Sequence, residues 1–338
     1  MSSVDATSNG VRAAPVDRWY SQKRLGGLSR FALAITILNF FGHVLLGFEQ
    51  AWIVPFIALA TAYAMDLTCE RLDAWGAGRA PRYEGSFVDL VKFLLPAHIT
   101  ALAVGMLLYS AHNFAAVIFA VVVAIGSKYL FRIEIDRNPK GGPIVRHFLN
   151  PSNFGIAITL VLFPSVGIAP PYQFAENTWG YIDWLLPLII IGTGSYLNIK
   201  ATGRMSLIAA WVAAFAFQAV IRGLVHGTPI AAGLMPMTGF AFILFTFYMI
   251  TDPATTPSKP RMQIVFAVSV ALAYAILMEL QVVFGLFFAL AIVTALRGLC
   301  IFVVRRWSFV IGRPGGSVAK PTLKEELVAV DILPSRRR

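Results

Sequence analysis

The chain has 338 residues, of which 57% are hydrophobic and only 13% are charged, and its formal net charge is +11. A soluble protein carries charges at about a quarter of its positions, so most of this chain must face lipid or its own interior. The composition therefore excludes a secreted module, a nucleic-acid-binding domain and a peripheral membrane protein. Cys69 and Cys300 are too few for a disulfide framework, an iron–sulfur cluster or a structural zinc site.

Apolar runs bounded by charged or turn residues predict an all-α, polytopic membrane protein with about ten transmembrane helices. The predicted helices occupy residues 28–48, 50–66, 89–110, 113–131, 154–170, 181–196, 205–224, 229–250, 263–281 and 283–304. The membrane domain accordingly covers residues 28–304. Residues 1–27 lack the apolar stretch of a signal peptide, and we expect a disordered cytoplasmic tail there and a basic cytoplasmic tail at 305–338.

The distribution of basic residues predicts the orientation of these helices. Lysine and arginine are enriched in cytoplasmic loops, and a ten-helix arrangement places 27 of the 28 basic residues on the side of the N-terminus, with only Arg222 on the other. One missed helix would invert every later loop and destroy this separation. We therefore expect a multi-pass protein of the cell inner (plasma) membrane with both termini in the cytoplasm.

Ten helices with both ends on one side divide into two five-helix halves of opposite orientation, which is the arrangement of inverted repeats. A weak sequence echo agrees with this division. Leu94-Leu95-Pro96 lies early in the third predicted helix, and Leu234-Met235-Pro236 lies at a similar depth in the eighth. A proline within a span frees a backbone carbonyl and kinks the helix.

Polar side chains within the predicted spans are functional candidates, because polar groups are costly in lipid. The set is Asn39, His43, His98, Asp183 and Gln218. Interhelical hydrogen bonding is the simpler explanation for each of them. Carboxylates lie only near the ends of the predicted helices, which argues against an autonomous ion pump.

Two cytoplasmic turns concentrate the most informative residues. In the first, Asn150 is a candidate N-cap for a helix that begins at Pro151, and Asn153 follows. In the second, Thr251-Asp252-Pro253 closes the eighth predicted helix and Thr255 follows. Each turn presents unpaired N–H groups, a helix dipole, and carboxamide or hydroxyl groups able to bond a polar heteroaromatic edge. On these physical grounds alone, well-capped helix ends explain both turns equally.

Both turns resemble motifs of the NQR2/RnfD family, whose members are membrane-embedded components of the sodium-translocating NADH:quinone reductase and of the Rnf electron-transport complex. Leu149-Asn150-Pro151-Ser152-Asn153 is similar to the Asn-Pro turn of that family. Met249-Ile250-Thr251-Asp252-Pro253 is similar to the end of its glycine- and phenylalanine-rich span. The likeness covers about residues 120–300 and implies the same ten-span layout.

The resemblance implies an inner-membrane electron-transfer subunit with one noncovalent flavin, riboflavin or FMN, on the cytoplasmic side. The implied flavin-binding residues are Asn150, Pro151, Asn153, Thr251, Asp252 and Thr255. The implied partners are the lipid bilayer and other membrane redox subunits or a cytoplasmic electron donor, with quinone as a further candidate and no nucleic acid. Whether the isolated chain is an enzyme stays open.

The chain departs from the family between the fifth and sixth predicted helices. There the family carries a Ser-Gly-Ala-Thr type sequence that bears a covalent FMN, and residues 165–180 contain no such motif. We therefore expect no covalent FMN, with Thr202 of Lys200-Ala201-Thr202 as the one alternative attachment residue. In this respect the chain resembles a shortened branch of the family that occurs in enediyne biosynthetic clusters.

A transporter or pore without a cofactor is the competing interpretation, since kinked helices in inverted repeats are typical of transporters. In that case Asn39, His98 and Gln218 would line the path. A scaffold subunit with neither activity is the third interpretation.

Overall fold

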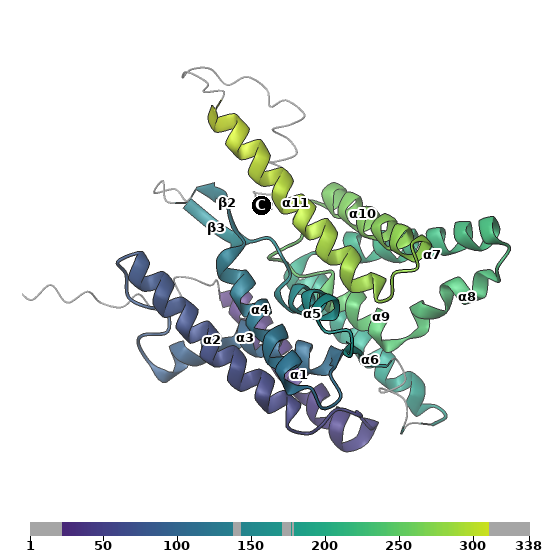
Figure 1. Cartoon of the computed structure of the whole chain (residues 1–338), viewed down its shortest axis with the longest axis horizontal. Helices are drawn as coiled ribbons and strands as arrows, with labels where there is room; N and C mark the ends of the chain where they lie inside the picture. Colours follow the sequence, from purple (N-terminus) through teal and green to yellow (C-terminus); the bar gives the residue numbers. More distant parts are fainter. Residues whose placement is uncertain (1–21, 138–142, 171–176, 178, 311–338) are drawn as a thin grey trace, which may run out of the picture.

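A computed structural model of the chain describes residues 22–137, 143–170, 177 and 179–310. These residues are mostly helical, which confirms the expected all-α class (Figure 1). The helices of the first half are α1 (Gln22–Phe41) with the π-helical turn η2 (Gly42–Leu46), α2 (Val54–Gly76), α3 (Phe87–Leu107), α4 (Phe114–Leu130) and α5 (Pro151–Leu162).

The second half begins with α6 (Ile182–Leu197), which continues into the π-helical turn η4 (Asn198–Thr202). It goes on with α7 (Met205–His226), α8 (Ile230–Leu234) with the 3-10 turn η5 (Met235–Thr238), α9 (Phe240–Leu244) with the π-helical turn η6 (Phe245–Met249), α10 (Pro260–Glu279) and α11 (Gly285–Val310). Two antiparallel strand pairs complete the described fold: β1 (Leu108–Tyr109) with β4 (Gly167–Ile168), and β2 (Arg132–Arg137) with β3 (Pro143–His147).

Six of the described helices are long and apolar enough to cross a membrane. A seventh is added if Ile230–Thr238 and Phe240–Met249, which meet at a bend of 66°, form one span. The chain is therefore a helical, multi-pass membrane protein by the length and composition of its helices. Each of the ten predicted segments overlaps a helix, although α4 and α5 are shorter and α2 is not among the six.

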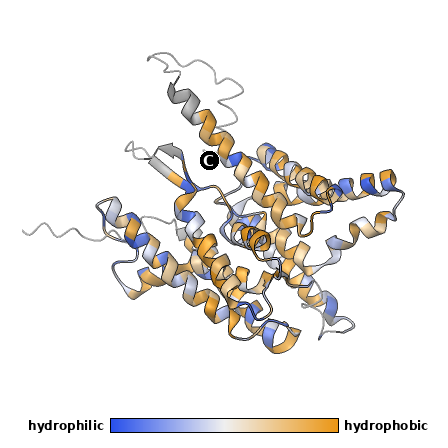
Figure 2. Cartoon of the chain, viewed as in Figure 1, coloured by the Kyte–Doolittle hydropathy of each residue, from blue (hydrophilic) through white to orange (hydrophobic). Residues whose placement is uncertain are grey.

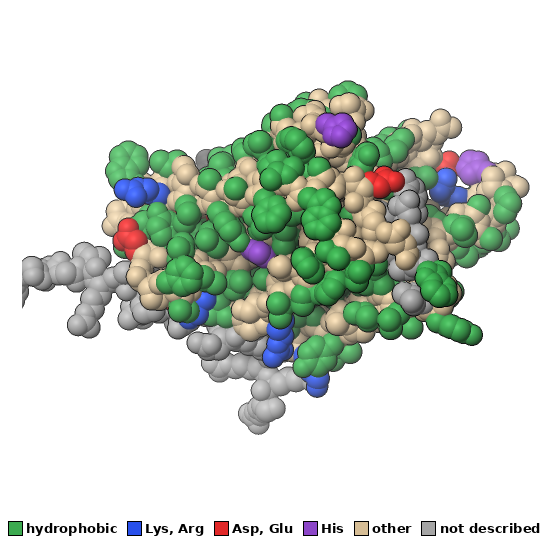
Figure 3. Space-filling model, turned by 90° about the horizontal axis from the view of Figure 1, so that it is seen from below, with side chains coloured by type: hydrophobic (Ala, Val, Ile, Leu, Met, Phe, Trp, Pro, Cys, Tyr) green, Lys and Arg blue, Asp and Glu red, His purple; other side chains and the backbone are tan. Residues whose placement is uncertain are grey.

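Large hydrophobic side chains cover much of the surface, as expected for contact with lipid. Phe56, Phe217 and Phe302 are each more than half exposed, whereas soluble monomers rarely expose extended apolar patches. Hydrophilic residues gather at helix ends and near the β2–β3 hairpin (Figure 2). One whole face of the molecule is mostly hydrophobic, with few charged side chains, most of them toward its margins (Figure 3).

Several helix boundaries differ from those predicted. α1 begins at Gln22 and α11 continues to Val310, so parts of both expected tails are helical. The remaining tail segments, residues 1–21 and 311–338, lie outside the described residues. α5 ends at Leu162 rather than at residue 170, since Pro164 has no N–H for a helical hydrogen bond and its ring clashes with the preceding turn.

Ion pairs explain why α2 continues past its apolar part to Gly76. Glu70 is fully buried and pairs with Arg79 at 2.6 Å and with Arg82. Asp66 accepts a hydrogen bond from Lys128 at the end of α4 at 3.0 Å. Unpaired carboxylates would be costly at such buried positions, and these partners allow α2 to pack along its whole length.

The β2–β3 hairpin was not among the predicted elements. Its strands pair with Arg132 opposite His147 and Arg137 opposite Pro143, and the register shifts between Glu134 and Asp136. The alternation of polar and apolar residues over 132–136, followed by the turn-forming residues 138–142, is a hairpin signal that hydropathy analysis overlooks. Residues 138–142 themselves lie outside the described residues.

The two halves share part of their helix contacts, although the packing of α3 on α4 and α5 has no comparable counterpart among the described helices of the second half. In the first half α2 packs on α3 and α4, and α4 packs on α5; in the second half α7 packs on α8 and α10, and α10 packs on α11. α5 and α11 contact each other in the middle of the molecule, between the helices of the two halves (Figure 1). This central contact places the start of α5 beside the second half of the chain.

Candidate functional site

The two turns singled out in the sequence meet in the structure. The Nδ2 atom of Asn150 donates a hydrogen bond of 3.1 Å to the backbone oxygen of Met249, 99 residues further along the chain. The Oδ1 atom of Asn150 accepts hydrogen bonds from the backbone nitrogen of Asn153 and from the hydroxyl of Ser152, both at 3.1 Å. The predicted N-cap of α5 is thus confirmed, and the same side chain joins the two turns.

The second turn is held by its own side chains and by two arginines. The Oδ1 atom of Asp252 accepts from the backbone nitrogen of Ala254 at 3.0 Å, and its Oδ2 atom accepts from the hydroxyl of Thr255 at 3.1 Å. Arg204 donates to Thr256 Oγ1 at 3.0 Å, and Arg297 donates to the backbone oxygen of Thr255 at 2.9 Å. The turn is therefore fixed to the start of α7 and to α11.

A cavity of about 620 Å³ lies against the joined turns. Its walls are mainly apolar side chains of α1, α3 and α6, among them Leu38, Ile99 and Ile190. Its polar lining residues are Thr100, Lys128, His147, Asn150, Ser152, Thr193, Thr202, Tyr248, Thr251 and Asp252, most of them in or near the joined turns. A cavity of about 300–1,000 Å³ with apolar walls and a few polar groups is typical of small-molecule and cofactor sites.

Of the six predicted site residues, the structure places four on this cavity and two away from it. Asn150, Pro151, Thr251 and Asp252 line the cavity, whereas Asn153 and Thr255 do not. Nδ2 of Asn153 donates to the backbone oxygen of Phe287 on α11 at 3.0 Å. Thr255 is 1% exposed. These two residues hold the turns against the rest of the protein.

Aromatic residues of the cavity wall were missed in the sequence. The rings of Phe31 on α1 and Tyr248 in η6 stack with their centroids 5.0 Å apart. The Tyr248 hydroxyl lies 2.7 Å from the hydroxyl of Thr193 on α6. The aromatic-rich run from Phe240 to Tyr248 is visible in the sequence. No sequence pattern predicts its contact with Phe31, which comes more than two hundred residues earlier.

The polar residues proposed for a transport path line neither this cavity nor a second one between α1 and α6. His98 lies 2.8 Å from Thr36 Oγ1 and 2.6 Å from the Tyr63 hydroxyl, so its ring nitrogens bridge neighbouring helices. Asn39 donates to the backbone oxygen of Ile35 within its own helix. Gln218 is buried, and its Oε1 atom has no hydrogen-bond partner among the described residues.

The remaining sequence candidates have the following positions. His43 contacts the backbone oxygen of Asn39 at 2.9 Å, and Asp183 lies in the first turn of α6. Thr202, the alternative residue for covalent FMN, lines the large cavity and donates to Asn198 Oδ1 at 2.7 Å. The loop over 165–180 is described only at residues 165–170, 177, 179 and 180.

The fold and this site together define a helical, multi-pass membrane protein with a largely apolar cavity that two joined turns border. The sequence matches no protein-family model, and no curated protein matches it.

Proposed function

We propose that the chain is an inner-membrane, flavin-binding electron-transfer subunit of the NQR2/RnfD type, with one noncovalent flavin in the large cavity and no covalent FMN. One observation carries the proposal. The two turns that resemble the motifs of that family are hydrogen-bonded to each other through Asn150 and Met249, and they border the same cavity.

The residues around the cavity fit a flavin. The isoalloxazine ring system is flat, with apolar faces and a polar pyrimidine edge, and the cavity pairs apolar walls with a polar end. The hydroxyls of Ser152 and Thr251 and the carboxylate of Asp252 all line the polar end. The N-terminus of α5 adds a helix dipole that favours negative charge. A bound flavin supplies the electron-transfer chemistry.

The hydrogen bonds of Asn150 suggest a different role from the one first expected. Its oxygen accepts two hydrogen bonds within the turn, and its nitrogen donates to Met249. We therefore assign Asn150 to positioning the two turns. Ser152 and Thr251 donate their hydroxyl hydrogens to Asn150 Oδ1 and to the backbone oxygen of Phe247. We accordingly assign these two hydroxyls and the Asp252 carboxylate to accepting hydrogen bonds from the N–H group of the pyrimidine edge. Asn153 and Thr255 lie outside the cavity and hold the two turns in place through their hydrogen bonds.

The proposal includes ten spans with both termini in the cytoplasm. Segments expected on the cytoplasmic side contact each other, as in the pair of Lys128 with Asp66. Segments expected outside do so as well: Gln50 donates to the backbone oxygen of Leu108 at 3.1 Å, and β1 pairs with β4. Arg222, the one basic residue expected outside, pairs with Glu279 at 2.8 Å.

Matching features of the two halves support an inverted repeat. α1 and α6 both continue into a π-helical turn that ends at a glycine with positive φ, Gly47 at 82° and Gly203 at 67°. In each of the two segments an asparagine, Asn39 or Asn198, donates to the backbone oxygen four residues earlier, at 2.9 Å. Together with the shared pattern of helix contacts, this favours α1–α5 and α6–α11 as equivalent units.

The absorbance spectrum of the purified protein tests the proposal. Protein isolated in detergent from flavin-replete cells should show flavin absorbance bands, and acid precipitation should release the flavin into the supernatant. The denatured band on a gel should lack flavin fluorescence, because the flavin is held noncovalently. Colourless protein would contradict the flavin, and a fluorescent band would contradict noncovalent binding.

Electron transfer by this chain requires partners. One flavin at the cytoplasmic end of the protein leaves the opposite end without a cofactor. The chain therefore exchanges electrons with a cytoplasmic donor, a membrane redox subunit or quinone, and does not carry them across the membrane alone.

A cofactor-free transporter is the second candidate, favoured by the 66° bend between Ile230–Thr238 and Phe240–Met249. Broken helices of this kind form binding sites in transporters. Flux into liposomes that survives Asn150→Ala and is abolished by His98→Ala or Gln218→Ala would support this candidate over the flavin-binding one.

A further inference from the structure

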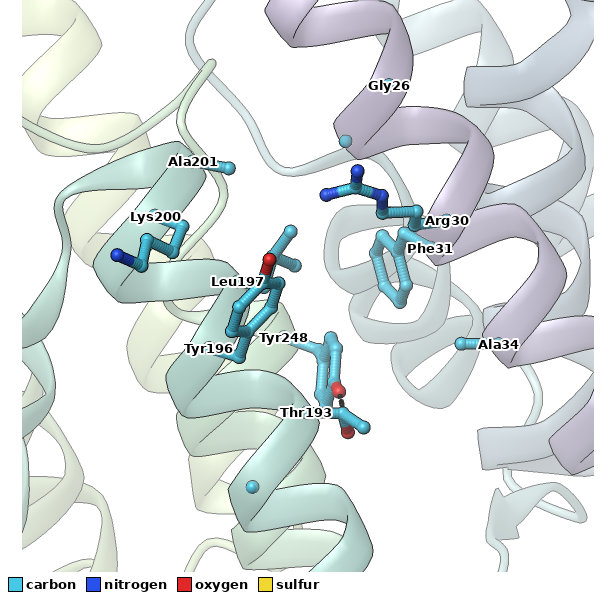
Figure 4. Close-up of a pocket in the computed structure, with 12 residues that line it drawn as sticks. Gly26, Arg30, Phe31, Ala34, Thr193, Tyr196, Leu197, Lys200, Ala201 and Tyr248 are labelled. Carbon is cyan, nitrogen blue, oxygen red and sulfur yellow. Dashed lines mark hydrogen bonds between the residues drawn. The ribbon is translucent and has the colours of Figure 1, made fainter.

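A second cavity, of about 520 Å³, separates the start of α1 from the end of α6 and the turn η4 (Figure 4). Small residues on both helices leave the space between them unfilled. They are Gly26, Gly27, Ala34, Gly192 and Ala201. A Cβ atom added at Gly26 or Gly192 would meet no atom within 4 Å. The cavity is thus a real opening between two helices.

The opening is basic. Arg30 and Lys200 line it, both are exposed, and neither has a hydrogen-bond or ion-pair partner among the described residues. The Arg30 guanidinium projects from α1 toward the gap, and the Tyr196 hydroxyl points to the same end of the cavity (Figure 4). Lys200 lines the same cavity from η4; in Figure 4 its amine points away from Arg30, and its flexible stem allows the amine to turn toward a bound anion. Within the part of the chain that the structure describes, no carboxylate lines the cavity.

Away from the two basic residues, the cavity is lined mainly by apolar side chains. Phe31, Ala34 and Leu197 line it, and the stacked Phe31 and Tyr248 rings form a wall that it shares with the large cavity. The Tyr248 hydroxyl is occupied by Thr193 at 2.7 Å. A ligand must therefore combine a negative group at the opening with an apolar portion below it.

We propose that this cavity binds one anionic phospholipid, with its phosphate at Arg30 and Lys200 and an acyl chain between α1 and α6. Both helices are candidate membrane spans, and only 22% and 17% of their apolar windows are buried within the protein. The cavity between them is thus open to the bilayer. Basic pockets between transmembrane helices at the cytoplasmic surface bind anionic headgroups in this way. A free phosphate would leave the apolar part unfilled.

Thermal unfolding of the delipidated, detergent-solubilised full chain tests the proposal. Phosphatidylglycerol should raise the Tm, and phosphatidylcholine with the same acyl chains should not. Arg30→Gln or Lys200→Gln should each raise the phosphatidylglycerol concentration for half-maximal effect roughly 5-fold, and the double variant roughly 30-fold, because each basic residue contributes about 1 kcal/mol. The double variant Arg71→Gln/Arg261→Gln removes two exposed charges outside the cavity and is the matched control.

A steric variant keeps the test independent of charge. Gly192→Leu places a side chain in open space within the cavity, so the protein should fold and should lose the response to phosphatidylglycerol. Equal responses to both lipids, or an unchanged response in the Arg30/Lys200 double variant, would overturn the proposal. Stabilisation by inorganic phosphate alone would overturn it in favour of a free anion. The readout does not involve a flavin, so this proposal and the proposed function fail separately.

Discussion

Asn150 shows how one side chain can serve both local and long-range structure. It caps α5 through Asn153 and joins that helix to the second turn through Met249. With 6% of its surface exposed, it has little access to water that could replace either bond. Its loss therefore has two consequences, a weaker helix start and a looser contact between the turns.

Asn150→Ala should lower the free energy of unfolding by about 1.5–2.5 kcal/mol, from about 1 kcal/mol for the cap and about 0.5–1.5 kcal/mol for the lost hydrogen bond to Met249, whose oxygen keeps a longer bond of 3.4 Å from the Asp252 nitrogen. It should also reduce the bound flavin per protein. Melting in detergent and absorbance of the purified protein measure the two effects. Asn113→Ala removes the N-cap of α4, where Asn113 Oδ1 accepts from Ala116 at 3.2 Å, and is the control that should keep the flavin. Equal flavin loss in both variants would contradict the role of Asn150.

Glu70 makes a second residue-scale prediction. Burial alone would raise its pKa, but hydrogen bonds from Arg82 and Arg79 outweigh burial and hold the pKa below the usual value of 4.5. A carboxylate with a lowered pKa in the folded state stabilises the fold above the unfolded pKa. This contribution is lost as the pH falls below about 4.5 and through the lower folded-state pKa.

Glu70→Gln should cost about 3 kcal/mol at neutral pH, since it removes the buried carboxylate that pairs with Arg82 and Arg79, while Arg79 keeps its pair with Asp73. It should also flatten the fall in Tm that the wild type shows as the pH drops below about 4.5. Melting curves across this range provide the measurement. Glu84→Gln, at an exposed carboxylate of the following loop, should change stability by no more than about 0.5 kcal/mol. A Tm of the Glu70 variant that falls as steeply as that of the wild type would refute the assignment.

At the scale of elements, the position of α5 depends on its close packing against α4. Ala116, Ala120 and Ala124 are all fully buried along α4, and Gly155 of α5 packs against this stripe. A Cβ atom at Gly155 would lie 2.8 Å from the Cβ of Ala124 and against the backbone oxygen of Ala120. Small residues let helix backbones approach closely in membranes. The 12 residues of α5 span only about 18 Å, so neighbouring helices must fix its place.

Gly155→Ala should therefore destabilise the protein by about 1–3 kcal/mol, because backbone atoms of α4 must move to accept the methyl group. Gly126→Ala is the matched control on α4. Its Cβ would lie 3.7 Å from Met65 Cε, an ordinary contact, and alanine is the better helix former. Thermal melting of both variants in the same detergent gives the comparison, and equal Tm values would show that the close approach is unimportant.

At the scale of the whole molecule, two groups of polar contacts lie at opposite ends of the helices. Near one end lie the ion pairs of Asp66 and Glu70 and the joined turns, and near the other lie the β1–β4 pair and the Arg222–Glu279 pair. This separation agrees with the sorting of basic residues in the sequence. It gives the topology a direct experimental test.

Single cysteines introduced in a Cys69→Ala/Cys300→Ala background should report the side of each loop. His112→Cys and Thr228→Cys, at exposed positions, should react with a membrane-impermeant maleimide in intact cells. Glu84→Cys and Arg261→Cys, also exposed, should react only after lysis. Labelling of Glu84→Cys from outside, or protection of Thr228→Cys, would contradict ten spans with the N-terminus inside.

The sequence by itself determined the class of protein, the order of its helices and the two capped turns. Hydropathy over about 20 residues and capping by Asn150 are local properties, and a local pattern predicts them. Only the tertiary structure decided that the turns meet and that Asn153 and Thr255 lie outside the cavity. It also brought Arg30 and Lys200 to one opening. These features depend on packing between residues that are far apart in the sequence, which no local pattern encodes. The bend of 66° in the eighth predicted helix is different, since Pro236 indicated a kink there.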